Sequence, residues 1–110
     1  QWYGRALRDP RQTIYIGLYE GASVGVCRFE LDDETGRAEV SINLNPAMRG
    51  KGLALPLLQT SIDSFTRGEG VVLTATINNA NAASRRIFSR CGFKLARAEA
   101  EYSRYTRAAG

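Results

Sequence analysis

The distribution of apolar residues before residue 45 predicts three consecutive β-strands. Residues 13–20 (TIYIGLYE) and 23–31 (SVGVCRFEL) are rich in β-branched and aromatic side chains, and the segment between them contains a glycine suited to a tight turn. Residues 38–44 (AEVSINL) follow a polar loop and alternate apolar with polar positions, the pattern of a strand with one buried face. We therefore expect a hairpin that is extended by a third antiparallel strand.

The spacing changes after Gly52, where apolar side chains recur every three or four positions. This spacing predicts an amphipathic helix that begins at about Gly52 and closes near Arg67 and Gly68. Pro56 falls within its first turn, where the missing N–H group costs least. The continuous apolar run at 71–77 (VVLTATI) is typical of a strand that is buried on both faces.

A second helix and two further strands are expected in the rest of the chain. Asn81 is a suitable N-cap for a helix with Ile87 on its inner side, and Gly92 can end that helix in the left-handed conformation. The segments 93–96 (FKLA) and 101–106 (EYSRYT) can pair as two strands. These elements predict a fold of the α+β (mixed α/β) class.

The residues before the hairpin show a different pattern. Trp2 to Leu7 are predicted to be the end of an amphipathic helix, which stops at Asp9-Pro10 because the residue before a proline is pushed away from helical angles. The chain begins with Gln1 rather than an initiating methionine, so we expect a fragment.

Composition limits the classes of function. A chain of 110 residues with 44% apolar residues forms one domain, and it has no apolar run long enough for a membrane span. Because histidine is absent, Ser-His and Cys-His catalysis and the common zinc sites are excluded. Cys27 and Cys91 lack metal-ligand spacing and are expected to be free thiols in a reducing compartment. With no visible signal peptide, we expect a soluble cytoplasmic protein without a metal.

The segment NPAMRGKGLALP, at 45–56, places two glycines and two cations between an expected strand and an expected helix. Free N–H groups at a helix N-terminus, beside the positive end of the helix dipole, form a site suited to phosphate. The net charge of +4 is compatible with an anionic partner, and the residue order fits neither a Walker A loop nor a dinucleotide fingerprint. Taken alone, the segment is equally consistent with a tight turn whose cations are solvated.

Two motifs make the anion-site interpretation more specific. RGKGLA, at 49–54, fits the pattern Arg/Gln-x-x-Gly-x-Gly/Ala, and NAASRRIFSRCGF, at 81–93, fits Asn-x-x-Ser followed by a helix-ending Gly-Phe. Together with AEVSINLNP before the turn, these motifs resemble the GNAT superfamily, the acetyl-CoA-dependent N-acetyltransferases. The resemblance extends from about Ile14 to Phe93. It implies a central, mostly antiparallel sheet with splayed middle strands, flanked by helices.

The resemblance also implies a position for acetyl-CoA and no metal. The pantetheine arm would lie between the two splayed strands, where the carbonyl of Ile42 would hold the arm and the N–H of Leu44 would polarise the thioester carbonyl. Asn81 and Ser84 would contact the far end of the arm. For Ile42 and Leu44, core packing is the alternative, and both roles are compatible. The pyrophosphate would rest on the backbone of Arg49, Gly50, Lys51, Gly52, Leu53 and Ala54.

Catalytic groups can be carried over in the same way. Attack by an amine requires a base, and Glu39 is our candidate because it lies on the strand beside the expected thioester; a solvated carboxylate or a salt bridge is the alternative. Many relatives have a tyrosine acid four residues before the helix-ending glycine, and Phe88 occupies that position here. Phe88 would instead be a wall against the arm. The acid stays open among water, Ser84 and another hydroxyl, unless the thiolate leaves unaided.

The chain starts later than members of this family usually do. We expect residues 1–110 to be a single GNAT-like domain without the first strand and helix, and without part of the acceptor pocket. The missing first strand would leave one edge of the sheet exposed. A second copy of the chain could cover this edge, so we expect a homodimer.

The acceptor is expected to be a small-molecule or peptide amine, either an amino sugar of a nucleotide-linked precursor or a protein N-terminus. One alternative is a non-catalytic acyl-CoA-binding domain, which Phe88 and the short N-terminus keep open. The other alternative is a basic nucleic-acid-binding module. It is disfavoured because the tyrosines are not interleaved with the basic turn.

Overall fold

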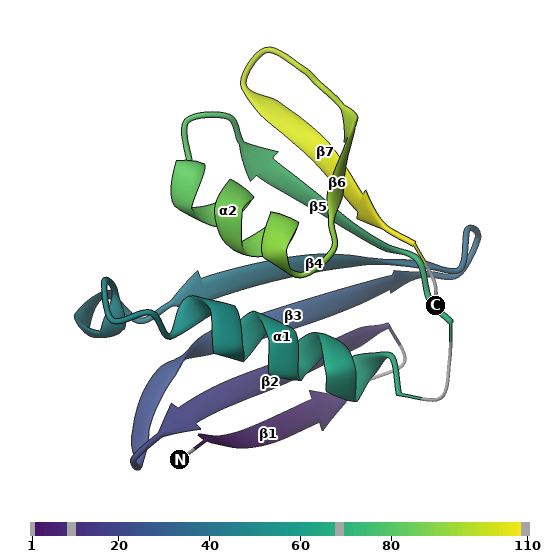
Figure 1. Ribbon diagram of the computed structural model, residues 1–110. Helices are drawn as coiled ribbons and strands as arrows, with labels where there is room; N and C mark the ends of the chain where they lie inside the picture. Colours follow the sequence, from purple (N-terminus) through teal and green to yellow (C-terminus); the bar gives the residue numbers. More distant parts are fainter. Residues whose placement is uncertain (1, 9–10, 68–69, 109–110) are drawn as a thin grey trace.

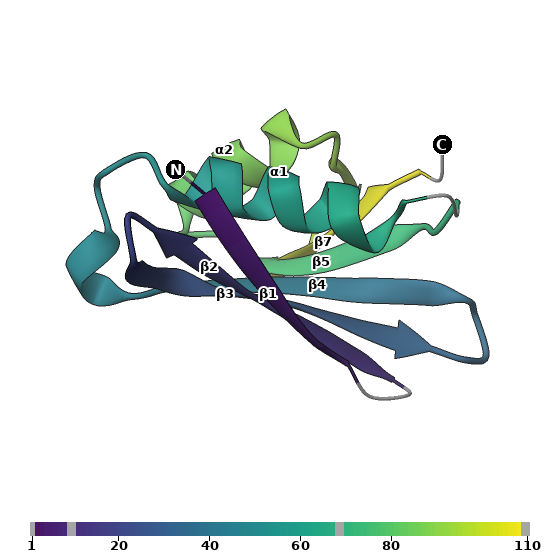
Figure 2. The ribbon, with the colours of Figure 1, turned by 90° about the horizontal axis from the view of Figure 1, so that it is seen from below.

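One seven-stranded sheet, in the order β1-β2-β3-β4-β5-β7-β6, forms the centre of the structure. The computed structural model describes residues 2–8, 11–67 and 70–108. Both helices lie on the same face of the sheet, and the opposite face carries no helix from these residues (Figures 1 and 2). The elements are β1 (Trp2–Arg8), β2 (Gln12–Tyr19), β3 (Ala22–Asp32), β4 (Arg37–Leu44), the 3₁₀ helix η1 (Pro46–Met48), α1 (Ala54–Phe65), β5 (Leu73–Asn78), α2 (Ala82–Arg90), β6 (Lys94–Arg97) and β7 (Tyr102–Arg107).

The predicted hairpin and third strand are confirmed. β2 and β3 pair antiparallel, and β3 pairs with β4 in one unbroken antiparallel register. The turn between β2 and β3 has positive φ at Glu20 and Gly21, the backbone conformation that a two-residue hairpin turn requires. β6 and β7 form the second predicted strand pair, so the α+β class is confirmed.

The prediction for the first residues is wrong, because Trp2–Arg8 is strand β1 rather than the end of a helix. β1 pairs with β2 antiparallel over its whole length. A segment of seven residues is too short for a stable isolated helix, whereas the edge of β2 offers it backbone hydrogen-bond partners. β1 therefore covers the edge of β2. The homodimer was predicted to cover an exposed sheet edge, so it stays a prediction without support from the edge of β2.

Burial along β5 also differs from the prediction. Leu73, Ala75 and Ile77 are at most 4% exposed, but Thr76 and Asn78 on the other face are exposed. Burial on both faces, which the apolar run predicts, is therefore wrong, because threonines occupy alternate positions 74 and 76. Only one face of β5 lies against the helices.

Both predicted helices are present with small shifts. α1 begins at Ala54, two residues later than expected, and Pro56 lies in its first turn as predicted. In α2 the buried residue is Phe88, while Ile87 is only half-buried. Gly92 follows α2 with φ +92, which confirms the predicted left-handed stop.

Aromatic side chains and the two cysteines fill the layer between sheet and helices. The ring of Phe29 stacks on Phe65 with centroids 4.2 Å apart and meets Tyr15 edge-on at 5.7 Å. Cys27 and Cys91 are buried free thiols. Burial raises the pKa of Cys27 to about 12 and also raises the pKa of Cys91. Both thiols are therefore protonated near neutral pH.

The Cys27 thiol is expected to resist modification in the folded protein. At pH 8 its raised pKa leaves almost no thiolate, and burial blocks access of the reagent. Ellman's reagent should therefore react with Cys27 only after denaturant unfolds the chain. Labelling of the native protein at the rate of an unfolded cysteine, located by peptide mass spectrometry, would contradict this prediction.

Gly25 is required by a close backbone contact between β3 and β4. A Cβ atom at this position would lie 2.4 Å from the carbonyl oxygen of Asn43 and 2.9 Å from the Cα of Leu44. Gly25→Ala should therefore lower the free energy of unfolding by roughly 1–3 kcal/mol, as overpacking does. Urea denaturation measures this change, with Ser23→Ala at an exposed position of β3 as the control. Equal midpoints for both variants would show that β4 accommodates the methyl group at no cost.

Candidate functional site

β4 and β5 are parallel neighbours that pair only at one end. The recorded register partners are Ala38↔Leu73 and Glu39↔Thr74, and the Ala38 N–H also donates to the Val72 carbonyl at 3.1 Å. Beyond Glu39 the two strands diverge, as Figure 1 shows. The opening between them, which we call the seam, separates the β1–β4 part of the sheet from the β5–β7 part.

Backbone polar groups of β4 point into the seam. The N–H of Asn45 donates to Val24 of β3 at 2.8 Å, whereas the N–H of Ala38 faces β5. Because alternate residues of a strand direct their N–H and C=O groups to opposite sides, Ile42 and Leu44 direct theirs toward β5, where no strand pairs with them. Their side chains are half-buried against the core. At these two residues the side chain therefore packs against the core while the backbone groups on the β5 side stay unpaired.

The glycine turn follows directly, at the open end of the seam. Gly50 and Gly52 have φ of +77 and +71, a conformation that favours glycine. Leu53 caps α1 without a side-chain hydrogen bond, and no hydrogen bond is recorded for the N–H groups of residues 50–54 in the described part of the chain. Arg49 differs, because its N–H donates to the Pro46 carbonyl at 3.3 Å. The turn thus presents free donors beside the positive end of α1.

The N-terminus of α2 lies at the same end of the molecule (Figure 1). The Asn81 side-chain oxygen accepts the Ser84 N–H at 3.0 Å, which confirms the predicted cap. Farther along α2, Phe88 is 3% exposed and meets Phe93 edge-on with centroids 5.0 Å apart. The contacts of Asn81, Ser84 and Phe88 with a bound arm remain predictions.

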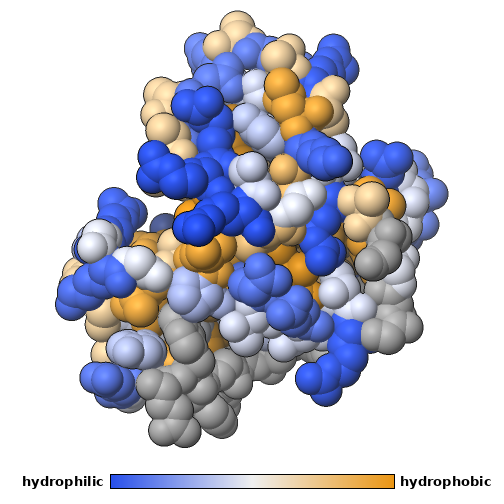
Figure 3. Space-filling model, viewed as in Figure 1, coloured by the Kyte–Doolittle hydropathy of each residue, from blue (hydrophilic) through white to orange (hydrophobic). Residues whose placement is uncertain are grey.

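Cations are concentrated on the outer side of α2. Arg85, Arg86 and Arg90 are exposed there, and Figure 3 shows strongly hydrophilic residues over this helix. Arg49 and Lys51 in the glycine turn are exposed as well. The helix-covered face therefore carries positive charge on the elements that flank the seam.

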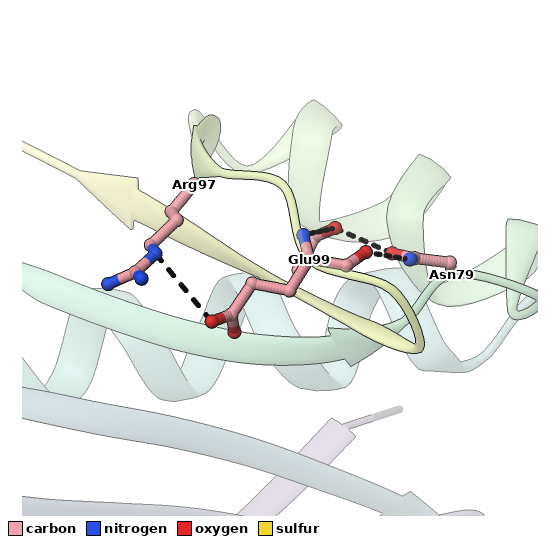
Figure 4. Close-up of polar contacts among 4 residues, drawn as sticks. Asn79, Arg97 and Glu99 are labelled. Carbon is pink, nitrogen blue, oxygen red and sulfur yellow. Dashed lines mark hydrogen bonds and ion pairs between the residues drawn. The ribbon is translucent and has the colours of Figure 1, made fainter.

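Asn79 is a structural residue that the sequence analysis missed. Its amide nitrogen donates to the carbonyl of Glu99 at 2.7 Å (Figure 4) and to that of Ala100 at 3.2 Å. Its side-chain oxygen accepts the Ser103 hydroxyl at 2.6 Å. These bonds fix the β6–β7 loop to the end of β5. The polar run NNAN after an apolar strand was the available signal.

Glu39 lies where the pairing of β4 and β5 ends. Its carboxylate accepts the Thr76 hydroxyl of β5 at 3.0 Å, so the contact bridges the two strands. Glu39 is exposed and also lines a groove with a volume of about 930 Å³, formed by the helix-free face of β3, β4, β5 and β7 together with the end of β6. The predicted base therefore stands where the seam and the groove meet.

The residues that the structure describes include neither a membrane-spanning helix nor a metal site. No helix there is long and apolar enough to cross a membrane. No group of three or more cysteine, aspartate or glutamate side chains in that part is placed to hold a metal ion.

Solved structures with the same fold are N-acetyltransferases. A spermidine N-acetyltransferase mutant from Vibrio cholerae superposes with a TM-score of 0.79 at 16% identity, and the match covers 92% of this chain and 66% of that chain. The Campylobacter jejuni N-acetyltransferase PseH gives 0.75 at 14% identity over 91% and 70%. The chain therefore spans about two thirds of the length of such structures.

A third structure is a ribosomal L7/L12 α-N-protein acetyltransferase in complex with coenzyme A, with a TM-score of 0.76 and 20% identity over 90% of this chain and 63% of that one. PseH has also been solved in complex with acetyl coenzyme A. Residues 1–94 match the family model of the acetyltransferase (GNAT) domain. Since this match covers most of the sequence, the chain belongs to the GNAT acetyltransferase family.

Proposed function

We propose that the chain is an N-acetyltransferase that moves an acetyl group from acetyl-CoA to a primary amine by direct attack. The observation that carries this proposal is the seam, in which no described strand pairs with the backbone of Ile42 and Leu44 on the β5 side. The seam leads from the free N–H groups of the glycine turn to the Glu39 carboxylate. Family membership supports the same conclusion.

The residues around the seam suit the parts of acetyl-CoA. The N–H groups of residues 50–54 and the dipole of α1 would hold the pyrophosphate, assisted by the side chains of Arg49 and Lys51. The Ile42 carbonyl would accept a hydrogen bond from the pantetheine arm as a strand neighbour would. Asn81 and Ser84 would border the arm from α2.

The reaction requires the removal of one proton before or during attack. The incoming ammonium would lose a proton to Glu39, directly or through a water, and the free amine would then form a C–N bond to the acetyl carbon. The Leu44 N–H would stabilise the developing negative charge on the carbonyl oxygen. As the C–S bond breaks, the attacking nitrogen would release its second proton to water. The departing thiolate would take a proton from that water or from a hydroxyl such as that of Ser84, because Phe88 has none.

The acceptor is proposed to be a small-molecule or peptide amine. The similar structures are named for spermidine and for the α-amino group of a ribosomal protein, so the fold is compatible with both classes. Our expectation from the sequence, an amino sugar of a nucleotide-linked precursor or a protein N-terminus, falls within this range. A homodimer is part of the proposal, and sedimentation velocity tests it.

A non-catalytic acyl-CoA-binding domain is the second candidate. It is favoured by Phe88, which is buried at the position where many family members place a tyrosine acid. Binding of acetyl-CoA without transfer to any amine would select it.

Gly52→Asp is expected to abolish binding of acetyl-CoA in a calorimetric titration. The variant places a carboxylate beside the free N–H groups where the pyrophosphate would lie. Gly21→Asp is the matched control, since Gly21 also has positive φ and a Cβ there, as at Gly52, would meet no atom within 4 Å. Equal affinities for the two variants would place the cofactor elsewhere.

Glu39→Gln should lower kcat for acetyl transfer by about 10²–10⁴-fold and leave acetyl-CoA affinity unchanged, as loss of a general base does. Glu20→Gln, which removes an exposed carboxylate in the β2–β3 turn, is the control. A parent-like kcat in Glu39→Gln would transfer the role of base to another group.

A further inference from the structure

Two pairs of like charges face the groove from opposite walls. Glu30 of β3 is the register partner of Glu39 of β4, and Arg97 of β6 is the register partner of Arg104 of β7. All four residues are exposed and line the groove. Each wall thus presents two charges of one sign at directly opposed strand positions. The wall of Glu30 and Glu39 remains predominantly acidic when the other charged lining residues on that side are included, which are Arg11, Asp32, Asp33, Glu34 and Arg37.

The two pairs share the helix-free face of the sheet. Glu39 accepts a hydrogen bond from Thr76, and Thr76 is in turn the register partner of Arg104. Between the walls lie Thr74 and Thr106, which are register partners of each other. The groove therefore has an anionic wall, a hydroxyl-bearing floor and a cationic wall.

Like charges at directly opposed strand positions destabilise a sheet. In the described part of the chain, the recorded ion pairs are Arg11–Asp33 at 3.7 Å and Arg97–Glu99 at 3.6 Å, and neither joins the two walls. Folding alone would favour opposite charges at these positions. The arrangement instead complements a ligand that carries both signs of charge.

The cationic wall is also held in position. Glu99 pairs with the Arg97 guanidinium, and the backbone carbonyl of Glu99 accepts the Asn79 amide at 2.7 Å (Figure 4). Asn79 follows the last residue of β5, so the loop that begins directly after Arg97 is tied to the strand that borders the seam. Asn79 acts here as a positioning residue for the wall.

We propose that the acceptor is a primary amine that also carries an anionic group, a phosphate or a carboxylate. Its ammonium would lie against Glu30 and Glu39, and its anionic group against Arg97 and Arg104. This proposal rests on the proposed acetyl transfer and specifies its substrate class. A linear polyamine is a poor fit, because its second ammonium would face the two guanidinium groups.

Matched acceptors test this class in an acetyl-transfer assay with acetyl-CoA. Glucosamine 6-phosphate and glucosamine differ by the phosphate, β-alanine and β-alaninamide differ by the carboxylate, and spermidine represents the polyamines. The anionic member of at least one pair should have a kcat/KM about tenfold or more above its neutral partner, the effect of a hydrogen bond to a charged group. Spermidine should be the poorest acceptor. The pair that shows this difference identifies whether the anionic group of the acceptor is a phosphate or a carboxylate.

The double variant Arg97→Gln/Arg104→Gln should erase this preference by raising KM for the anionic acceptor, with little change in kcat. Arg67→Gln removes an exposed arginine outside the groove and should keep the preference.

Glu30→Gln should raise KM for every acceptor. Each change relieves repulsion within a pair, and Arg97→Gln also removes the exposed ion pair with Glu99, which contributes little to stability, so the midpoint of thermal unfolding should change little. A lower midpoint with equal losses for both acceptors would show a structural role only and would overturn the proposal.

The outcomes separate this proposal from the one on which it rests. Acetylation with spermidine preferred, or with no difference within either pair, overturns the substrate class and leaves acetyl transfer standing. If acetyl-CoA binds and no amine is acetylated, the proposed function fails. In that case, calorimetric titration of glucosamine 6-phosphate and of β-alanine into the CoA-bound protein decides the matter: binding that is lost in the double arginine variant supports the groove as the site, and no binding overturns it.

Discussion

The short parallel contact between β4 and β5 is the constraint on which the rest of this structure depends. β4 is fully paired with β3 on its outer side, and β5 is paired with β7 along its whole length, so each strand belongs to a separate half of the sheet. Within the described residues, strand pairing joins the halves at Ala38 and Glu39. Beyond that point, N–H and C=O groups of β4 on the β5 side lack strand partners among the described residues, and the proposed cofactor, an extended ligand with amide groups, would supply them. Gly25 strengthens this arrangement, because the absence of a side chain lets β3 hold the end of β4 close.

The loops that follow the two separated strands put polar groups at the opening. After β4 come the 3₁₀ turn and the glycines with positive φ, which leave the first N–H groups of α1 free. β5 ends with the first residue of NNAN, at 78–81, and each asparagine of this segment makes a different hydrogen bond. Asn78 accepts the Ala80 N–H at 2.9 Å, Asn79 holds the β6–β7 loop, and Asn81 caps α2. One short segment thereby couples a helix N-terminus, the seam and one wall of the groove.

Local signals in the sequence were sufficient for much of this fold. The hairpin, strand 38–44, both helices, the Asn81 cap and the Gly92 stop depend on periodicity and on side chains within a few positions of one another, so they were predicted. Strand β1 was misread as helix because its conformation is set by pairing with β2, which its own pattern does not show. The walls of the groove were also beyond reach, because strand register brings Glu30 opposite Glu39 and Arg97 opposite Arg104.

Strand register also shows where the charged residues behind the net charge lie. A value of +4 was compatible with an anionic partner and did not say where one would bind. In the structure, the exposed cations of the glycine turn and α2 lie at the helix-covered side of the seam, and a groove with walls of opposite charge lies on the other side. A polyanionic donor and a smaller acceptor with both charges can then approach from opposite faces without competing for the same cations. Glu39 is the carboxylate that reaches the place where both would meet, because β4 lies at the boundary between seam and groove.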